Sequence, residues 1–416
     1  MILKSKPKFN LVLLLFFSFI HAQKTMTWKL TNPQLANSKA IDSSLNYLQN
    51  TASLENLFEK LYVLKTTSSN NKIIFSHIGD SHIQADKITA VIRNKFQNYF
   101  GNAGRGVIYP HRVAKTNGAD EVFSSSEQLW QNSRLSKLNP NVACGITGHG
   151  IKTNNALAEI KIELKDTVKN NFDQVTLFYG KGIKQIAIET DNKLDTITID
   201  SASQFIRYQM PSIGSKFKIK LEPVANKPIG FFGAAVSKKS ESGIIYNAIG
   251  ANGAKVSDYN QAPLFWEQLP ELKTDCFIIS LGTNEAQNQN LTSDQYTIEL
   301  QTMVKNIKNS APEATIIVFS PPVSYYKKTK PNKILPIISV SIKDFCIQNN
   351  LVFWDFFQIS KGSQGTAAWR KYKLLNTDLV HFTNVGYALQ GALFSTAFAN
   401  AYNEFVFKKQ PKTEDK

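Results

Sequence analysis

A chain of 416 residues with a formal charge of +16 is longer than one ordinary domain, and its surplus of basic residues could attract anionic polymers or surfaces. The lysines are scattered, and the sequence has neither zinc-finger spacing nor a basic-region helix, so we expect no nucleic-acid partner. Two alternatives stay open: an anionic cell envelope as neighbour, or a solvated basic surface with no partner.

The first 22 residues have the pattern of a secretory signal peptide. Lys4, Lys6 and Lys8 precede an apolar run at residues 11–20 that is too short to span a bilayer, and Ala22 supplies a small residue at the cleavage point. We therefore predict a signal peptide at 1–22 and an exported protein, periplasmic or extracellular; an uncleaved anchor is the alternative. Cleavage removes three lysines and no acid, which lowers the charge from +16 to +13. No later segment is long and apolar enough to cross a membrane, so we expect no stable membrane insertion after cleavage.

Residues 23–70 are polar at first and then helical in pattern. We expect this segment to pack against the outside of the domain that follows. Its apolar stripe consists of Ile41, Leu45, Leu48, Leu54, Leu57 and Leu61.

A short buried strand is predicted from the β-branched and aromatic residues at 73–78, and a helix from the apolar spacing that begins at Ile83. Gly79-Asp80-Ser81 stands between them, so Ser81 is expected at the carboxyl end of a strand and the start of a helix. Ligands bind at that edge of open α/β sheets, and the helix start offers free N–H groups to a developing oxyanion. The alternative is that Asp80 or Ser81 only caps the helix.

The glycine-rich segment at 100–106 lacks the Lys-Ser/Thr ending of a phosphate-binding loop and is predicted to be a turn. We place the first part of an α/β domain at 71–114.

Residues 115–244 lose helical periodicity and show short alternating segments with turn residues between them. This pattern predicts an inserted β-sandwich or jelly roll. The predicted strands are 158–164, 175–179, 183–188, 196–199, 205–208, 217–221 and 229–236.

Strands and helices alternate again from residue 245 to 407, which is typical of a parallel sheet covered by helices. Strands are predicted at 243–249, 276–281, 315–320 and 351–355, with helices at 296–308 and 335–348. The charged tail at 408–416 is predicted to be disordered. Cys144, Cys276 and Cys346 form no metal-ligand pair, and one disulfide between an undetermined two of them is possible.

A serine nucleophile needs a base, and the base needs a group that orients it. His381 lies near the end of the α/β region, and Asp378 stands three residues before it, close enough to accept the other ring N–H. A surface histidine beside a helix-capping aspartate is the alternative. His77 and His82 flank Ser81 too closely in the chain to fold back on it easily.

Two further predicted strand ends carry candidates for an oxyanion hole. Gly253 can bring a backbone N–H close to a substrate because it has no Cβ, although Gly250 lies in the same turn. Asn284 offers a side-chain amide after the next strand. Each of these could instead be an ordinary turn residue.

Taken together, these blocks resemble the SGNH (GDSL-type) hydrolases. The resemblance rests on four segments: 79–82, the turn that holds Gly253, 282–285 and 378–381. It implies a flavodoxin-like three-layer α/β fold, with Ser81 as nucleophile, His381 as general base and Asp378 as its orienting partner. It also implies an oxyanion hole made by the N–H groups of Ser81 and Gly253 and the amide of Asn284.

Two positions depart from the family pattern: His82 replaces the leucine of the naming motif, and Glu285 replaces the commoner aspartate. The β-rich insertion resembles the peptidoglycan O-acetylesterase branch, in which a carbohydrate-binding-like sandwich interrupts the hydrolase. The resemblance implies a secreted esterase that removes O-acetyl groups from a polysaccharide, with neither metal nor organic cofactor. The alternatives are an O-acetyltransferase with the same site and a glycan-binding protein with a relict hydrolase domain; the sequence leaves the oligomeric state open.

Overall fold

The computed structural model describes residues 27–30, 39–67, 71–156, 158–167, 169–191, 193–225 and 227–409. The predicted signal peptide lies outside these residues. Among the helices of the described ranges, none has the length and apolar character needed to cross a bilayer.

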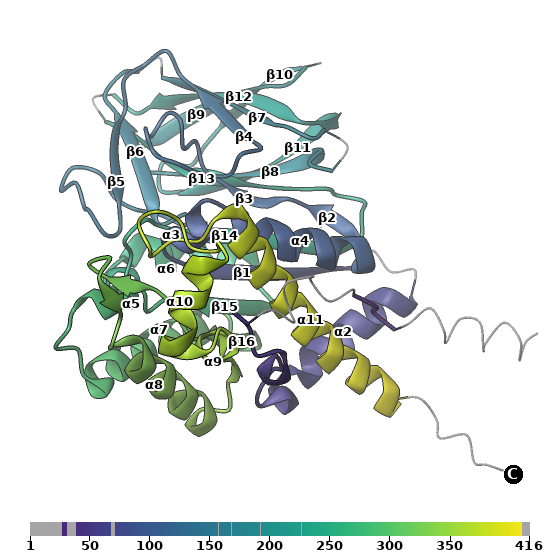
Figure 1. Cartoon of the computed structure of the whole chain (residues 1–416). Coiled ribbons are helices and arrows are strands. Elements are labelled where there is room, and N and C mark those ends of the chain that lie inside the picture. The colour runs from purple at the N-terminus through teal and green to yellow at the C-terminus, as the bar shows by residue number, and fades with distance from the viewer. Residues whose placement is uncertain are drawn as a thin grey trace, which may run out of the picture.

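A six-stranded sheet, parallel throughout, forms the centre of the lower part of the molecule in Figure 1, with the strand order β19-β16-β15-β1-β14-β2. The strands are β1 (Lys72–Gly79), β2 (Asn102–Gly104), β14 (Gly243–Gly250), β15 (Cys276–Ser280), β16 (Thr315–Phe319) and β19 (Val352–Trp354). Their residues are almost continuously apolar because a parallel sheet is buried on both faces.

Without the short edge strand β2, the order of the sheet is the flavodoxin-like 2-1-3-4-5. The direction of winding reverses between β1 and β15, which pair in register from Phe75↔Cys276 to Gly79↔Ser280. Ligands of open α/β sheets bind beyond the carboxyl ends of the strands at such a reversal. The topology alone therefore directs attention to the residues that follow Gly79 and Ser280.

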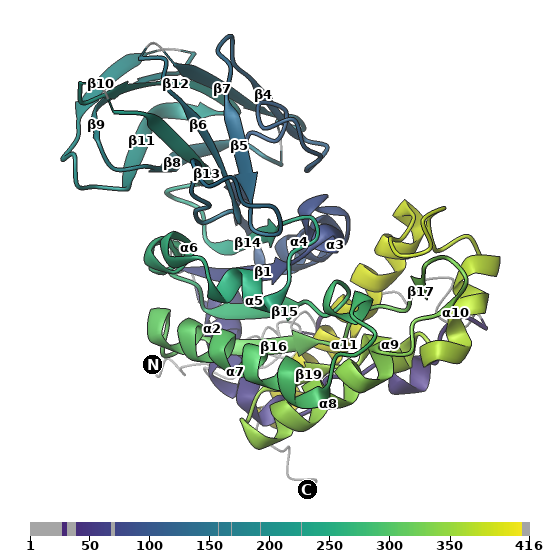
Figure 2. The ribbon, with the colours of Figure 1, turned by 90° about the vertical axis from the view of Figure 1, so that its left-hand side faces the viewer.

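Helices cover both faces of this sheet. In Figures 1 and 2, α2, α4 and α11 lie on one side and α5 to α8 on the other. The helices are α2 (Glu55–Thr66), α3 (Ser81–Gln84), α4 (Lys87–Phe100), α5 (Val256–Asn260), α6 (Pro263–Gln268), α7 (Ser293–Ser310), α8 (Leu335–Gln348), α9 (Phe356–Ile359), α10 (Gly362–Lys371) and α11 (Asn384–Lys409), with 3-10 turns η2 (Ser43–Leu45), η3 (Thr51–Leu54), η4 (Leu269–Leu272) and η5 (Glu285–Gln287). A short antiparallel hairpin is formed by β17 (Tyr325–Tyr326) and β18 (Lys330–Pro331).

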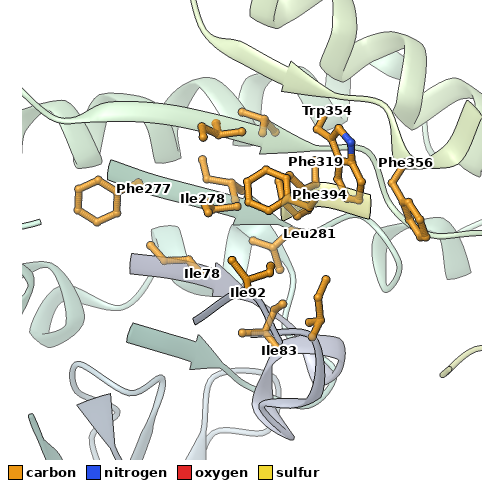
Figure 3. Close-up of a cluster of buried hydrophobic side chains, with 14 of the residues drawn as sticks. Ile78, Ile83, Ile92, Phe277, Ile278, Leu281, Phe319, Trp354, Phe356 and Phe394 are labelled. Atoms are coloured by element: carbon orange, nitrogen blue, oxygen red, sulfur yellow. The ribbon is translucent and has the colours of Figure 1, made fainter. Parts of the chain in front are cut away.

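The core between the sheet and α11 is aromatic. The ring of Phe319 on β16 lies 4.6 Å from the rings of both Trp354 on β19 and Phe394 on α11, measured between centroids, and Figure 3 shows this cluster beside Ile278. At the crossing of α11 and α4, a Cβ on Gly391 would lie 2.9 Å from Cβ of Val91, so the glycine permits close packing of the two helices.

The inserted region is all β, as predicted. Its two antiparallel sheets have the orders β10-β9-β12-β7-β4 and β11-β8-β13-β6-β5, with β3 added beside β13. The strands are β3 (Gly106–Ile108), β4 (Val122–Ser125), β5 (Gln131–Arg134), β6 (His149–Thr153), β7 (Glu159–Leu164), β8 (Phe172–Tyr179), β9 (Ile183–Glu189), β10 (Leu194–Thr198), β11 (Phe205–Gly214), β12 (Lys216–Pro223) and β13 (Ile229–Ser237). Residues of both sheets, such as Ile162 and Leu177, share one buried cluster, so the sheets pack face to face as a sandwich.

The prediction for the glycine-rich segment was wrong. The glycine-rich segment at 100–106 is not only a turn, because β2 extends the parallel sheet within it and β3 begins at Gly106 in the sandwich. The chain thus leaves the parallel sheet between Gly104 and Gly106 and re-enters it at Gly243. The limits 71–114, 115–244 and 245–407 themselves stay a prediction.

The N-terminal segment is less helical than its apolar stripe indicated. Within the described residues of 23–70, α2 begins only at Glu55, and residues 39–54 form short turns. Gln49 forms a bridge with Phe353, and the Asn46 amide donates to the carbonyl of Leu393 (3.0 Å), so this segment does pack on the parallel-sheet domain. At the other end, α11 extends to Lys409, into the tail predicted for 408–416; residues 410–416 lie outside the described ranges. All three cysteines are buried free thiols, so no two of them are joined.

Candidate active site

The turn after β1 presents Ser81 at the edge of the sheet. Asp80 caps α3: its carbonyl accepts from the N–H groups of Ile83 and Gln84, and its Oδ1 accepts from the N–H of His82 at 2.9 Å. Gly79 allows the end of β1 to lie this close to β15, because a Cβ on Gly79 would lie 2.8 Å from the carbonyl oxygen of Ser280. Asp80 is therefore a helix cap, and Ser81 is half-buried at the first helical position.

A second segment, between α10 and α11, carries the histidine to that serine. The Nε2 atom of His381 lies 2.7 Å from Oγ of Ser81, and its Nδ1 atom lies 2.7 Å from Oδ2 of Asp378. Oδ1 of Asp378 accepts from the backbone N–H groups of Val380 and His381, both at 2.9 Å. Burial opposes ionisation of Asp378, but these hydrogen bonds outweigh it and lower the pKa of the carboxyl. An ionised Asp378 holds the proton on Nδ1, which leaves Nε2 free to accept from the Ser81 hydroxyl.

Gly253 and Asn284 line the same cleft, of about 590 Å³, as Ser81 and His381. Gly253 has a φ of +79°, a conformation that favours glycine. Gly250, the other glycine of this turn, ends β14 instead, where a Cβ would lie 2.3 Å from the backbone nitrogen of Gln84. The structure therefore brings together all the predicted site residues, and of the two glycines only Gly253 lines the cleft.

The amide of Asn284 is held by two acceptors. Its Nδ2 atom donates to Oδ2 of Asp80 at 3.1 Å and to the carbonyl of Ala254 at 3.0 Å. Both hydrogens are thus engaged, so an oxyanion would have to share or replace one of these acceptors. Asp80 is 1% exposed, and burial raises the pKa of its carboxyl to about 7.

Glu285, one of the two departures from the family pattern, is buried and contacts the start of α5. Its Oε1 atom accepts from the N–H of Val256 at 2.7 Å, which fixes the loop between Gly253 and α5. Burial raises the pKa of Glu285 to about 7 as well. The glutamate side chain, which is longer than that of the commoner aspartate, thus connects the segments that follow β14 and β15.

Several residues of this region escaped sequence reasoning. His82 lies beside the base, with ring centroids 5.2 Å apart, and its Nδ1 atom lies 3.0 Å from the hydroxyl of Tyr387. Burial lowers the pKa of His82 to about 3, so the ring next to His381 is uncharged at neutral pH. Asn117 and Arg134 reach the cleft from the insertion. No motif marks Asn117 or Arg134, because only the tertiary fold carries them there, and the segment 79–82 contains His82 without indicating that its ring lies beside that of His381. Within the described residues, no group of three or more histidine, cysteine or acidic side chains could hold a metal ion.

Residues 224–389 match the family model of the GDSL-like Lipase/Acylhydrolase family. Among curated proteins, none matches the chain significantly. The structure is similar to that of a peptidoglycan O-acetylesterase, with a TM-score of 0.71 and 20% identity over 87% of this chain and 99% of that chain, which shows a common fold including the insertion.

Looser likenesses exist to two other solved esterases. A family two carbohydrate esterase from Clostridium thermocellum has a TM-score of 0.29 and 10% identity over 60% of this chain and 94% of that one. An acetylxylan esterase from Geobacillus stearothermophilus has a TM-score of 0.28 and 20% identity over 38% of this chain and 73% of that one. Neither likeness is close enough to support an inference about this chain.

Proposed function

We propose that this chain, which carries a domain of the GDSL-like lipase/acylhydrolase family, is a serine esterase that removes O-acetyl groups from a polysaccharide. The observation that carries the proposal is the line of contacts from Ser81 through His381 to Asp378, two hydrogen bonds of 2.7 Å at the reversal point of the sheet. Its fold, shared with a peptidoglycan O-acetylesterase, supports the choice of an acetylated glycan as substrate.

In the proposed mechanism, Ser81 Oγ forms a bond to the ester carbonyl carbon while its proton passes to Nε2 of His381. The carbonyl electrons move onto oxygen, and that oxyanion is held by the N–H groups of Ser81 and Gly253 and the amide of Asn284. Each such donor lowers the barrier by about 3 kcal/mol. The tetrahedral centre then collapses: the C–O bond to the sugar breaks, and His381 gives its proton to the sugar oxygen.

The acetyl group now remains on Ser81. Water attacks this acyl-enzyme while His381 takes one of its protons, and the second collapse returns that proton to Ser81 and releases acetate. Ionised Asp378 stabilises the imidazolium in both halves of the cycle. Export of the protein, through cleavage of residues 1–22, belongs to the same proposal, since the substrate would lie in the cell envelope.

The experiment is the Ser81→Ala variant with p-nitrophenyl acetate. We expect hydrolysis to fall to near the uncatalysed rate while the thermal midpoint of unfolding stays within a few degrees of the parent protein. Ser125→Ala, the same change at an exposed serine of β4 in the insertion, is the matched control and should keep the parent rate. Retained turnover in folded Ser81→Ala would rule out Ser81 as the nucleophile. Product analysis with a glycan acceptor separates transfer to sugar from hydrolysis, and a fluorophosphonate that fails to label Ser81 would favour a non-catalytic glycan-binding protein.

A further inference from the structure

The tip of the insertion packs against the loop that holds Asn252 and Gly253, two residues of the cleft lining. It lies between β5 and β6 and is packed into the parallel-sheet domain, because Leu135, Cys144 and Ile146 belong to the hydrophobic cluster of that domain and not to the core of the sandwich. The hydroxyl of Ser136 donates to the carbonyl of Asn252, and a Cβ on Gly253 would lie 3.1 Å from that hydroxyl. The tip is therefore fixed beside a proposed oxyanion donor.

Arg134 ends β5 at the base of this tip and lines the cleft together with Ser81 and His381. A tight turn holds its backbone, since the N–H of Lys137 donates to the Arg134 carbonyl at 2.9 Å and Arg134 pairs with His149 across β5 and β6. The side chain is half-buried, and its Nε atom is buried with no hydrogen-bond partner.

Other cations of this region already have carboxylates. Arg93 and Arg105 share Asp86, and Lys87, which also lines the cleft, pairs with Asp120. Arg134 forms no ion pair with any acid of the described residues. A guanidinium that is partly desolvated without a partner carries an energetic cost, and its planar fork matches a carboxylate.

We infer that Arg134 is a specificity-determining residue that binds a carboxylate of the substrate close to the acetyl ester, so that the preferred substrates are acetylated acidic sugars. This inference rests on the proposed esterase activity. Lys87 in the cleft lining is paired with Asp120, and Asp378 is hydrogen-bonded to His381, which leaves Arg134, among the described residues there, as the unpaired charge beside amides such as those of Asn117 and Asn252. One such cation balances the single charge of a carboxylate better than the double charge of a phosphate. The insertion would thus select the substrate and the parallel-sheet domain would cleave it.

Matched substrate pairs test this inference. 6-O-acetyl-N-acetylmuramic acid differs from 6-O-acetyl-N-acetylglucosamine by a 3-O-lactyl group, which carries a carboxylate. An acetylated methyl galacturonoside differs from its galactoside only at C6, which is a carboxylate in the first and a hydroxymethyl group in the second. We expect the parent protein to prefer the acidic member of at least one pair in kcat/KM by roughly ten- to a hundredfold, the usual range for a charge-assisted hydrogen bond.

In Arg134→Gln that preference should vanish, and in Arg134→Lys it should survive in part, because the charge stays and the fork is lost. Lys137→Gln, which removes the same charge from an exposed side chain of the same tip, is the control and should keep the full preference. No preference in the parent protein, or an equal fall on both members of a pair in Arg134→Gln, would overturn the inference.

A binding measurement separates this inference from the esterase proposal. Calorimetry with the deacetylated acidic sugar should show at least a tenfold weaker affinity in Arg134→Gln than in the parent protein, whether or not acetate is released. Loss of turnover with intact, Arg134-dependent binding would count against the esterase alone, whereas unchanged binding would refute the role of Arg134.

Discussion

The most informative perturbation of the site is Asp80→Asn, because it changes one atom next to the proposed oxyanion donor. In the parent protein, Oδ1 of Asp80 accepts from the N–H of His82 and Oδ2 accepts from Nδ2 of Asn284. Asparagine can keep the first bond with its own oxygen. Its Nδ2 then faces Nδ2 of Asn284, and two donors meet in a site that is 1% exposed.

The size of the effect follows from that conflict. A buried donor without an acceptor costs about 1–3 kcal/mol. If that cost falls on the placement of Asn284 in the transition state, kcat should drop between about fivefold and about a hundredfold. Removing the amide altogether, in Asn284→Ala, should cost about 10²- to 10³-fold.

The pH dependence gives a sharper signature. Burial raises the pKa of Asp80 to about 7, so the carboxylate is present above that pH and protonated below it. Asparagine imitates the protonated state at every pH. The ratio of the parent rate to the Asp80→Asn rate should therefore approach one below pH 7 and rise to a plateau above it.

The assay is kcat for p-nitrophenyl acetate between pH 6 and pH 9 for the parent, both single variants and the double variant. Because Asp80 is argued to act through Asn284, the double variant should be no slower than Asn284→Ala alone. Glu285→Gln, a second buried acid changed to its amide, should lower kcat less, since its Oε2 atom faces no donor. A double variant slowed by the full product of both factors, or a pH-independent ratio, would refute this account.

Three further outcomes are expected. Asp378→Asn should lower kcat by up to about 10⁴-fold without a loss of stability, measured by steady-state kinetics and thermal unfolding, because an amide no longer selects the Nδ1–H tautomer. Leu135→Ala should lower the free energy of unfolding by about 2–5 kcal/mol in urea titrations and weaken the preference for acidic sugars, because it leaves a cavity under the tip. Acid should also unfold the protein: burial lowers the pKa of four histidines, which are His77, His82 and His111 (each to about 3) and His149 (to about 4). The stability that these neutral rings contribute is present above their unfolded pKa near 6.5 and is lost as the pH falls. The raised pKa values of Asp80 and Glu285 act in the opposite direction and offset part of this loss. The free energy of unfolding should therefore fall by about 3 kcal/mol from pH 7 to pH 5. A flat urea midpoint over that range would contradict this balance.

The sequence predicted the positions of Ser81 and Asn284 well because each comes directly after a predicted strand. A strand end is a fixed point of an α/β fold, so a serine or an asparagine just after a strand must lie at the carboxyl edge of the sheet. Asp378 stands only three residues before His381 in the sequence, so the two side chains are close wherever the segment lies. The placements of Ser81 and Asn284 therefore need no knowledge of a distant contact, whereas that of His381 beside Ser81 joins residues 300 apart in the chain.

Other features could not be predicted from the sequence because they depend on tertiary contacts. Residues 39–54 carry apolar residues at helical spacing, yet they lie as short turns across the parallel-sheet domain because tertiary contacts, such as those of Asn46, override propensity. Strands β4, β5 and β6 have few alternating apolar residues, so the sequence showed no strand periodicity there and the three strands were not predicted. Arg134 was invisible as a site residue, because only the pairing of β5 with β6 and the burial of Leu135 carry it to the cleft.

The way the insertion joins the parallel-sheet domain decides how its residues can act. A sandwich attached only through flexible connections could gather substrate but could not orient an ester within the tolerance that acyl transfer needs. Here Leu135 and Ile146 are buried in the core of the parallel-sheet domain, and Ser136 is hydrogen-bonded to the loop that carries Gly253. A shift of the tip would have to disturb that core or that loop. A substrate carboxylate held by Arg134 would therefore hold its sugar at a fixed distance from Ser81, and the selection of the substrate and the placement of its ester would be one event.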